Sequence, residues 1–187
     1  MVYFICGHRG SGKSYAAHQL KDNLNCNLFD TGPIVRKAYK DYGNGLKFSE
    51  WLSKGESEVG KNFTNEIICR NIEIDPNETT IIIGNRALQG IEFIIQYFDI
   101  ENYKICYLDG DYDLFRNNYN TREGLNDTKE EFNQIMKAEE MMGITDIEKF
   151  VYENPDKSIY YFKNQNDTVF LDLIMEDIKS KKKVLKK

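Results

Sequence analysis

The sequence predicts an α/β fold, a three-layer sandwich in which a central five-stranded parallel sheet carries helices on both faces. Short apolar runs rich in β-branched and aromatic residues recur along the 187 residues, and segments with the spacing of amphipathic helices separate them. Strands that alternate with helices in this way pair in parallel through right-handed crossovers, so both faces of the sheet are covered. The length suits one domain over residues 1–187.

Five runs are expected to be strands, at residues 2–6, 26–30, 79–84, 103–108 and 158–163. The third run, residues 79–84, is continuous and β-branched, as is typical of a central parallel strand. One helix is expected to begin at Lys13, and another to carry Pro33 in its first turn, where proline is tolerated. The remaining helices are expected after the third strand, at 128–142 and 146–153, and after residue 167.

Three segments depart from this alternation. Residues 42–77 contain no expected strand; a short helix at 48–52 and a longer one at about 57–74 form a helical excursion over the sheet edge, in which Trp51 and Phe63 are expected to pack. Residues 109–126 are polar and rich in asparagine, which indicates a mobile segment. The basic end at 179–187 is expected to be a frayed tail.

Composition excludes several classes of function. A formal net charge of −5 argues against broad nucleic-acid binding, which needs a basic field to displace counterions. No apolar run approaches the ~20 residues that span a bilayer, and the first strand begins without a charged leader, so a cytoplasmic protein is expected. The four cysteines lack a C-x-x-C spacing and are expected to be buried thiols.

Residues 7–14 match the phosphate-binding pattern G-x-x-x-x-G-K-[ST] (Walker A) at every fixed position, and they read Gly7, His8, Arg9, Gly10, Ser11, Gly12, Lys13 and Ser14. The glycines let successive N–H groups turn inward and form a nest for phosphate oxygens. Lys13 is expected to reach the β- and γ-phosphates, and the Ser14 hydroxyl to bind Mg²⁺. Because a strand precedes this loop and a helix follows it, the pattern predicts ATP and Mg²⁺ as cofactors. His8 is expected to be a loop residue rather than a base.

Two arginines follow strand ends beside this loop. Asp30 ends the second strand and Arg36 lies near the start of the next helix, while Asn85 and Arg86 follow the third strand at once. In open α/β sheets, ligands bind at the carboxyl ends of the strands. A single arginine at a strand end usually forms a surface ion pair. Because Arg36 and Arg86 both follow strand ends beside the loop, the sequence favours a binding role for the two together.

These residues resemble the P-loop nucleoside monophosphate kinases, above all bacterial cytidylate kinase and, toward the C-terminus, dephospho-CoA kinase. The stretch Phe29-Asp30-Thr31-Gly32-Pro33-Ile34-Val35-Arg36 is similar to a cytidylate kinase motif, and residues 162–167 resemble the strand, turn and helix of dephospho-CoA kinase. The resemblance implies strand order 2-3-1-4-5, an acceptor-binding insertion at 42–77 and a short lid at 109–126. The sequence departs from the family at the third strand, which no carboxylate follows, so Asp30 would take the magnesium role.

The resemblance implies transfer of the γ-phosphoryl group of ATP·Mg to a nucleoside or deoxynucleoside monophosphate. Arg36 and Arg86 would hold the acceptor phosphate, as planar guanidinium groups suit. Arg116 and Arg122 would close from the lid to neutralise the transferring group, and Asp30 would orient a magnesium-bound water or act as a base. The expected catalytic residues are therefore Lys13, Asp30, Arg86, Arg116 and Arg122.

Other interpretations stay open at the level of sequence. A kinase of the same build could act on dephospho-CoA or another small metabolite, whose alcohol would need a base. A nucleotide-binding regulatory ATPase would have no acceptor at all. Asp109, before Gly110, is explained equally well as a turn residue. A monomer and a homodimer are both compatible with the sequence.

Overall fold

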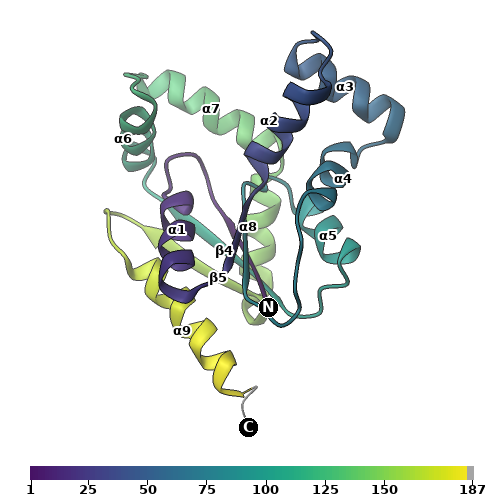
Figure 1. Ribbon diagram of the computed structural model, residues 1–187. Helices are drawn as coiled ribbons and strands as arrows, with labels where there is room; N and C mark the ends of the chain where they lie inside the picture. Colours follow the sequence, from purple (N-terminus) through teal and green to yellow (C-terminus); the bar gives the residue numbers. More distant parts are fainter. Residues whose placement is uncertain (185–187) are drawn as a thin grey trace.

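The computed structural model describes residues 1–184 as one sheet flanked by helices (Figure 1). The strands are β1 (Val2–Cys6), β2 (Asn27–Asp30), β3 (Thr80–Ile83), β4 (Tyr103–Gly110) and β5 (Ser158–Lys163). The helices before β4 are α1 (Lys13–Leu24), α2 (Thr31–Tyr42), α3 (Phe48–Val59), α4 (Phe63–Arg70) and α5 (Leu88–Tyr97). After β4 come α6 (Tyr112–Glu123), α7 (Lys129–Met141), α8 (Ile144–Glu153), a 3₁₀ turn (Pro155–Lys157) and α9 (Val169–Val184).

All five strands are parallel and stand in the order β2-β3-β1-β4-β5, which confirms the predicted sheet. β1 lies in the middle, with β3 on one side and β4 on the other. After β1 the chain forms β2 and β3 on one side of β1, and it then crosses to form β4 and β5 on the other side. The direction in which strands are added therefore reverses beside β1. This switch point opens a crevice outside the carboxyl ends of the strands, directly where the loop 7–14 begins.

The two faces of the sheet bury separate sets of side chains, because successive residues of a strand point to opposite faces. Tyr3 and Ile5 of β1 pack with α1 and α9, whereas Phe4 and Cys6 pack with α4, α5 and α8. β1, β3 and most of β4 are buried on both faces, which explains their continuous apolar sequence. All four cysteines are buried, as expected, and burial raises the pKa of Cys69 to about 11.

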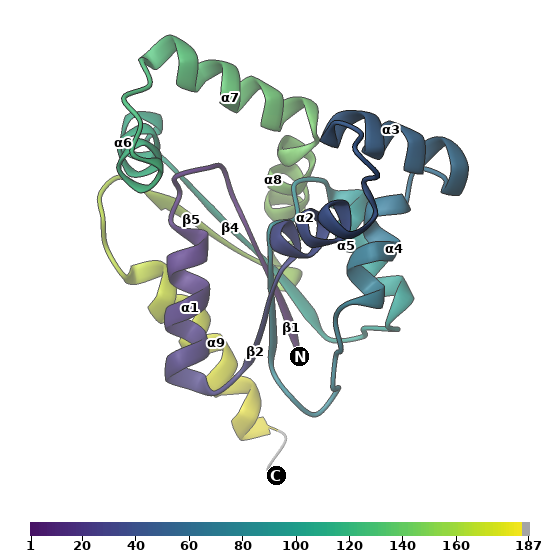
Figure 2. The ribbon, with the colours of Figure 1, turned by 45° about the horizontal axis from the view of Figure 1, so that its top comes forward.

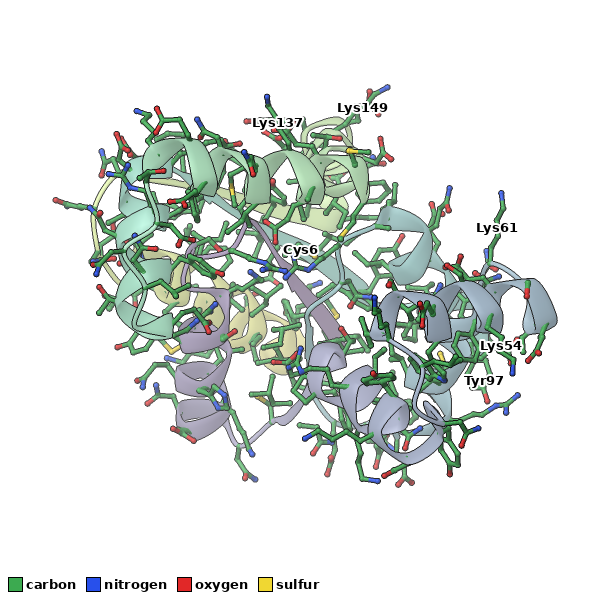
Figure 3. All side chains as sticks on the ribbon, turned by 90° about the horizontal axis from the view of Figure 1, so that it is seen from above. Cys6, Lys54, Lys61, Tyr97, Lys137 and Lys149 are labelled. Atoms are coloured by element: carbon green, nitrogen blue, oxygen red, sulfur yellow. The ribbon has the colours of Figure 1, made fainter. Side chains whose placement is uncertain are left out.

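Two helical pairs rise above the carboxyl edge of the sheet, and we call them the α2–α3 arm and the α6–α7 arm (Figure 2). Seen from above, the end of β1 at Cys6 lies between these arms (Figure 3). Trp51 is buried in the first arm, edge-on to Phe63 with 5.1 Å between ring centroids, which confirms its packing role. The crevice over the sheet is thus walled by segments far apart in the sequence.

The predicted division of residues 42–77 into helices is wrong, although the absence of a strand there is confirmed. The first helix continues from Phe48 to Val59, because Trp51 and Gly55 keep a helical spacing of buried positions. The break falls instead at Gly60, whose φ of +111° ends the helix. The second helix then ends at Arg70, four residues earlier than expected, and Arg70 pairs with Glu66 at 2.9 Å.

The polar segment 109–126, where the sequence predicted no helix, is mostly helical, because α6 fills residues 112–123. Its expected mobility stays a prediction. The Asp111 carboxylate accepts the N–H groups of Asp113 and Leu114 and so caps the start of α6. Phe115 and Tyr119 on one face of α6 are buried against Phe132 of α7. Polar composition concealed this helix, because only a narrow apolar stripe is needed to join it to α7. Its opening and closing over a ligand stay a prediction.

Other differences are small and lie at element ends. β4 continues through Asp109 to Gly110, so Asp109 is a strand residue rather than a turn residue, and it accepts a hydrogen bond of 2.8 Å from the Tyr160 hydroxyl. α8 begins at Ile144, two residues earlier than expected. α9 extends through much of the expected tail to Val184, and residues 185–187 lie outside the described residues. No helix in residues 1–184 is both long and apolar enough to cross a membrane.

The Asp177 carboxylate fixes α9 to the sheet, and it should make stability depend on pH. It accepts hydrogen bonds from Tyr3 (2.6 Å) and Lys104 (2.8 Å). Burial opposes ionisation, but these two donors hold the pKa of Asp177 below its usual value. A depressed carboxyl pKa gives stability that is complete above its unfolded value of ~3.9 and is lost as pH falls through the folded value.

We therefore expect Asp177→Asn to lower the free energy of unfolding by about 1 kcal/mol at pH 7 and by much less at pH 2.5. Urea unfolding at both pH values measures this. Glu176→Gln, an exposed neighbour on the same helix, removes the same charge and should change little. A loss in Asp177→Asn that is equally large at both pH values would contradict the assignment.

Candidate functional site

The loop 7–14 leaves β1 and wraps over the start of α1. Gly7 and Gly10 have φ of +140° and +78°, conformations that side chains with a Cβ rarely adopt. A Cβ at Gly7 would also collide with the carbonyl oxygen of Leu108, and one at Gly10 with that of Phe115. The glycines thus allow the loop to lie against β4 and α6. Lys13 and Ser14, at the N-terminus of α1, line the central hollow at the carboxyl edge of the sheet.

Lys13 is the cation at the centre of the site. Its ammonium donates a 2.9 Å hydrogen bond to the carbonyl of His8, across the loop. Burial, together with the nearby guanidinium groups of Arg86 and Arg122, lowers the pKa of Lys13 to about 7. A lysine held in this way gains charge when an anion binds beside it, since the anion favours the protonated form.

A buried carboxylate, Glu139 of α7, lies beneath these cations, and sequence reasoning missed it. It is 2% exposed. It accepts 3.0 and 3.2 Å hydrogen bonds from the backbone N–H and Nε of Arg9, and a further hydrogen bond from Nη1 of Arg86. The run Glu139-Glu140-Met141-Met142 looks like any polar helix end in the sequence, so no local pattern could have shown that the first of these acids is buried.

His8 also contacts Glu139, at 3.2 Å through Nδ1, and its Nε2 lies 3.3 Å from the Tyr112 hydroxyl. Burial lowers the pKa of His8, so the ring is neutral at pH 7. A carboxylate only accepts, so Nδ1 carries the proton and Tyr112 donates to Nε2. His8 is a loop residue, as the sequence predicted, and its buried ring links the loop to the α6–α7 arm.

Three hollows that share lining residues lie at the carboxyl edge of the sheet, and two of them are lined by the loop. The central cavity, of about 630 Å³, is lined by Lys13 and Ser14 together with a cationic set, Arg9, Arg36, Arg86 and Arg122. The loop cavity, of about 420 Å³, shares Lys13, Ser14 and Arg122 and adds Tyr15, Asn118 and Lys163. The outer cavity, of about 780 Å³, shares Arg36 and Arg86 and runs between α2, α3, α4 and α5. The central cavity therefore joins the other two.

Asp30 and Arg36, predicted from the sequence, do meet at the central cavity. One oxygen of Asp30 accepts the N–H of Gly32 at 3.0 Å and caps α2, which leaves the other without a hydrogen bond among residues 1–184. Arg36 is exposed and has no ion pair within the described chain. Gly84, with φ of +99°, lets the start of α2 lie close to the end of β3, since a Cβ at this position would collide with the Thr31 hydroxyl.

The structure does not bring Arg116 into this group. Its guanidinium lies 3.6 Å from Asp113, one turn earlier on α6, and it lines none of the three cavities. Arg122, six residues further along α6, lines both the loop and central cavities, and its guanidinium lies 5.7 Å from the centroid of the Tyr119 ring. Of the two arginines expected from the lid, one is at the site.

Lys163 is a second residue that sequence reasoning missed. It ends β5 with 8% exposure and lines the loop cavity. Asn118 of α6 donates to the Gly10 carbonyl at 3.0 Å and to Asn166 at 3.3 Å, so α6 and the turn after β5 meet over this cavity. The outer cavity holds a buried amide, Asn85, whose Oδ1 has no hydrogen-bond partner within residues 1–184.

Ser14 and Asp30 are the side chains expected to hold Mg²⁺, and both line the central cavity. No cluster of three or more His, Cys, Asp or Glu side chains suited to a metal occurs in residues 1–184. Mg²⁺ is usually held by one or two protein oxygens together with phosphates and water. A hydroxyl and one free carboxylate oxygen beside the loop fit such an ion.

No protein-family model matches the sequence, and no curated protein matches it. A solved structure with a similar fold is described as "Crystal structure of uncharacterized protein from Eubacterium ventriosum ATCC 27560". It is 19% identical in sequence, superposes with a TM-score of 0.58, and the match covers 96% of this chain and 99% of that chain. At this identity the likeness shows the α/β fold alone.

Removal of the Glu139 charge should destabilise the site. We expect Glu139→Gln to lower the free energy of unfolding by about 2 kcal/mol, because two guanidinium groups lose their buried counter-charge. Thermal or urea unfolding at pH 7 measures this. Glu140→Gln removes an exposed charge from the next residue of the same helix and is the matched control. Equal stability of the two variants would show that the carboxylate is not needed where it lies.

Proposed function

We propose that this protein is a P-loop kinase that moves the γ-phosphoryl group of ATP·Mg to a nucleoside or deoxynucleoside monophosphate. One observation carries the proposal. Five cationic side chains, Arg9, Lys13, Arg36, Arg86 and Arg122, line one cavity beside a glycine-rich loop, in a chain whose net charge is −5. So many cations repel each other unless an anion lies between them.

Glu139 neutralises only part of this charge, because a single carboxylate faces both Arg9 and Arg86. Within the described residues Arg36 has no acidic partner, and the one acid paired with Arg122 is Glu123, beside it in the chain. The excess suits a ligand with several negative charges. A triphosphate on the loop and a monophosphate across from it would supply them.

The order of the cavities supports the assignment of each substrate. The loop cavity suits the nucleoside half of ATP, since it lies on the α1 side of the loop. The central cavity, with Lys13 and most of the arginines, suits the transferring phosphoryl group. The outer cavity suits the acceptor, whose phosphate would meet Arg36 and Arg86 at its inner end. The donor and acceptor phosphates would then face one another.

Phosphoryl transfer needs positioning and cancellation of charge more than covalent chemistry. Lys13 and Arg86 would neutralise charge on the transferring group, and Arg122 would approach from α6 to exclude water. Ser14 and Asp30 would hold Mg²⁺, which would draw charge from the phosphate oxygens. Arg116 would join only if it left Asp113.

A kinase that acts on an alcohol, such as dephospho-CoA, is a second candidate. Such an acceptor must lose a proton, and the free oxygen of Asp30 in the central cavity could accept it. A regulatory ATPase would need no outer cavity, yet Arg36 stands at the junction of that cavity and the central one.

The deciding experiment couples ADP release from ATP·Mg to a panel of ribo- and deoxynucleoside monophosphates and dephospho-CoA. We expect one acceptor class to stimulate release strongly, and Lys13→Ala to lower that rate by at least about 100-fold, as loss of a charge-stabilising group does. Tight ATP binding with a flat panel would contradict the kinase and favour the regulatory ATPase.

Substitution of Arg36 tests the acceptor-binding part of the site separately from the ATP-binding part. Arg36→Ala should raise the KM for the acceptor by about 10- to 100-fold, the weight of a hydrogen bond to a charged group, and leave the KM for ATP nearly unchanged. Steady-state kinetics with each substrate varied in turn measures both. Arg70→Ala, which removes an exposed arginine from α4, is the control. An unchanged acceptor KM would remove Arg36 from the site.

A further inference from the structure

Lys163 is a buried cation without a counter-charge. Its side chain is 8% exposed, and it makes neither a hydrogen bond nor an ion pair through its ammonium within residues 1–184. Asp167 is the acid that acts on it electrostatically, but that carboxylate is occupied by the Tyr161 hydroxyl (2.9 Å) and the N–H of Val169 (3.2 Å). Burial lowers the pKa of Lys163 below its usual value.

The position of Lys163 is fixed by the fold. Its carbonyl accepts a 3.0 Å hydrogen bond from the N–H of Asp111, at the point where β4 gives way to α6. A buried ammonium without a partner is costly, and side chains of this kind usually reach solvent or a carboxylate. Lys163 instead turns toward the phosphate-binding loop.

Its ammonium lies 3.4 Å from the place that a Cβ on Gly12 would occupy. Gly12 directly precedes Lys13, so the two lysines stand close to the same turn of the loop. They differ in what they face. Lys13 lines both the loop and central cavities, whereas Lys163 lines the loop cavity and is absent from the central cavity with its arginines.

We infer that Lys163 is a second phosphate-binding cation, which contacts the α-phosphate of the nucleotide on the side of the loop away from the bond that breaks. The inference rests on the proposed function, since it takes the loop to hold a nucleotide. The phosphate chain would run from the central cavity, where the γ-phosphoryl group transfers, across the loop to the α-phosphate in the loop cavity.

A contact with the α-phosphate is the same before and after transfer. Lys163 is therefore a binding and positioning residue, and it should contribute equally to the affinity for ATP and for ADP. An interaction that is equal in the ground and transition states changes affinity without changing kcat. Lys13, which reaches the transferring group, should affect kcat as well.

The test compares Lys163→Met with the wild-type protein by calorimetric titration of ATP and ADP, and by competition of AMP and adenosine against bound ADP, so that each constant reports on the loop. Methionine keeps an unbranched apolar side chain, one atom shorter than that of lysine, so the packing of β5 should be largely preserved. We expect the dissociation constants of ATP, ADP and AMP each to rise by about 10-fold, and that of adenosine, measured by competition against ADP, to stay the same. Lys163→Arg should recover part of the loss.

Lys149→Met is the matched control, because Lys149 projects from α8 into solvent with 73% exposure of its side chain (Figure 3). Wild-type affinity for ATP in Lys163→Met would overturn the inference and leave the proposed function intact. A loss for ATP and ADP without one for AMP would overturn the α-phosphate contact, and so would an equal loss for adenosine. A wild-type protein that binds none of these ligands would overturn the proposed function itself, and this inference with it.

Discussion

The buried carboxylate of Glu139 is the interaction on which the arrangement of the site depends. It joins three segments that the sequence keeps far apart: the loop through Arg9, the end of β3 through Arg86, and α7. Cations that converge on one cavity repel each other, and the repulsion is strongest where water is excluded. A carboxylate among them offsets that repulsion and sets the orientation of both guanidinium groups. The same contact fastens the α6–α7 arm to the sheet.

The sheet topology supplies the place where this can happen. Because β1 lies between β3 and β4, the loop after β1 and the segment after β3 open on either side of one crevice. β2 pairs with β3, so Asp30 enters the same crevice from the next strand. The glycines matter for this reason: Gly84 allows the start of α2 to approach β3, and Gly10 allows α6 to approach the loop.

The sequence revealed what depends on local pattern. Strands buried on both faces give continuous apolar runs, and the loop 7–14 has a fixed spacing, so the sheet and the position of the loop were predicted. The helix α6 was not, because one buried stripe of Phe115 and Tyr119 within polar residues leaves a weak periodic signal. Glu139 and Lys163 could not be found at all. Their roles come from burial and from neighbours on other segments, and nothing in the residues beside them records either.

The side chains around the loop are fixed by other residues, whereas Arg36 on the α2–α3 arm is not, within the described residues. This difference affects how the site would bind its ligands. Arg9 and Arg86 are fixed by Glu139, and Lys13 by the His8 carbonyl, so the half around the loop is organised before any ligand arrives. Arg36 has no such tether and lies exposed at the edge of the α2–α3 arm. An untethered long side chain loses rotamer freedom when it binds, so under the proposed function this cost would weaken the first contact of Arg36 with an acceptor. A nucleotide on the loop would then meet a ready site, while the acceptor would have to complete its own.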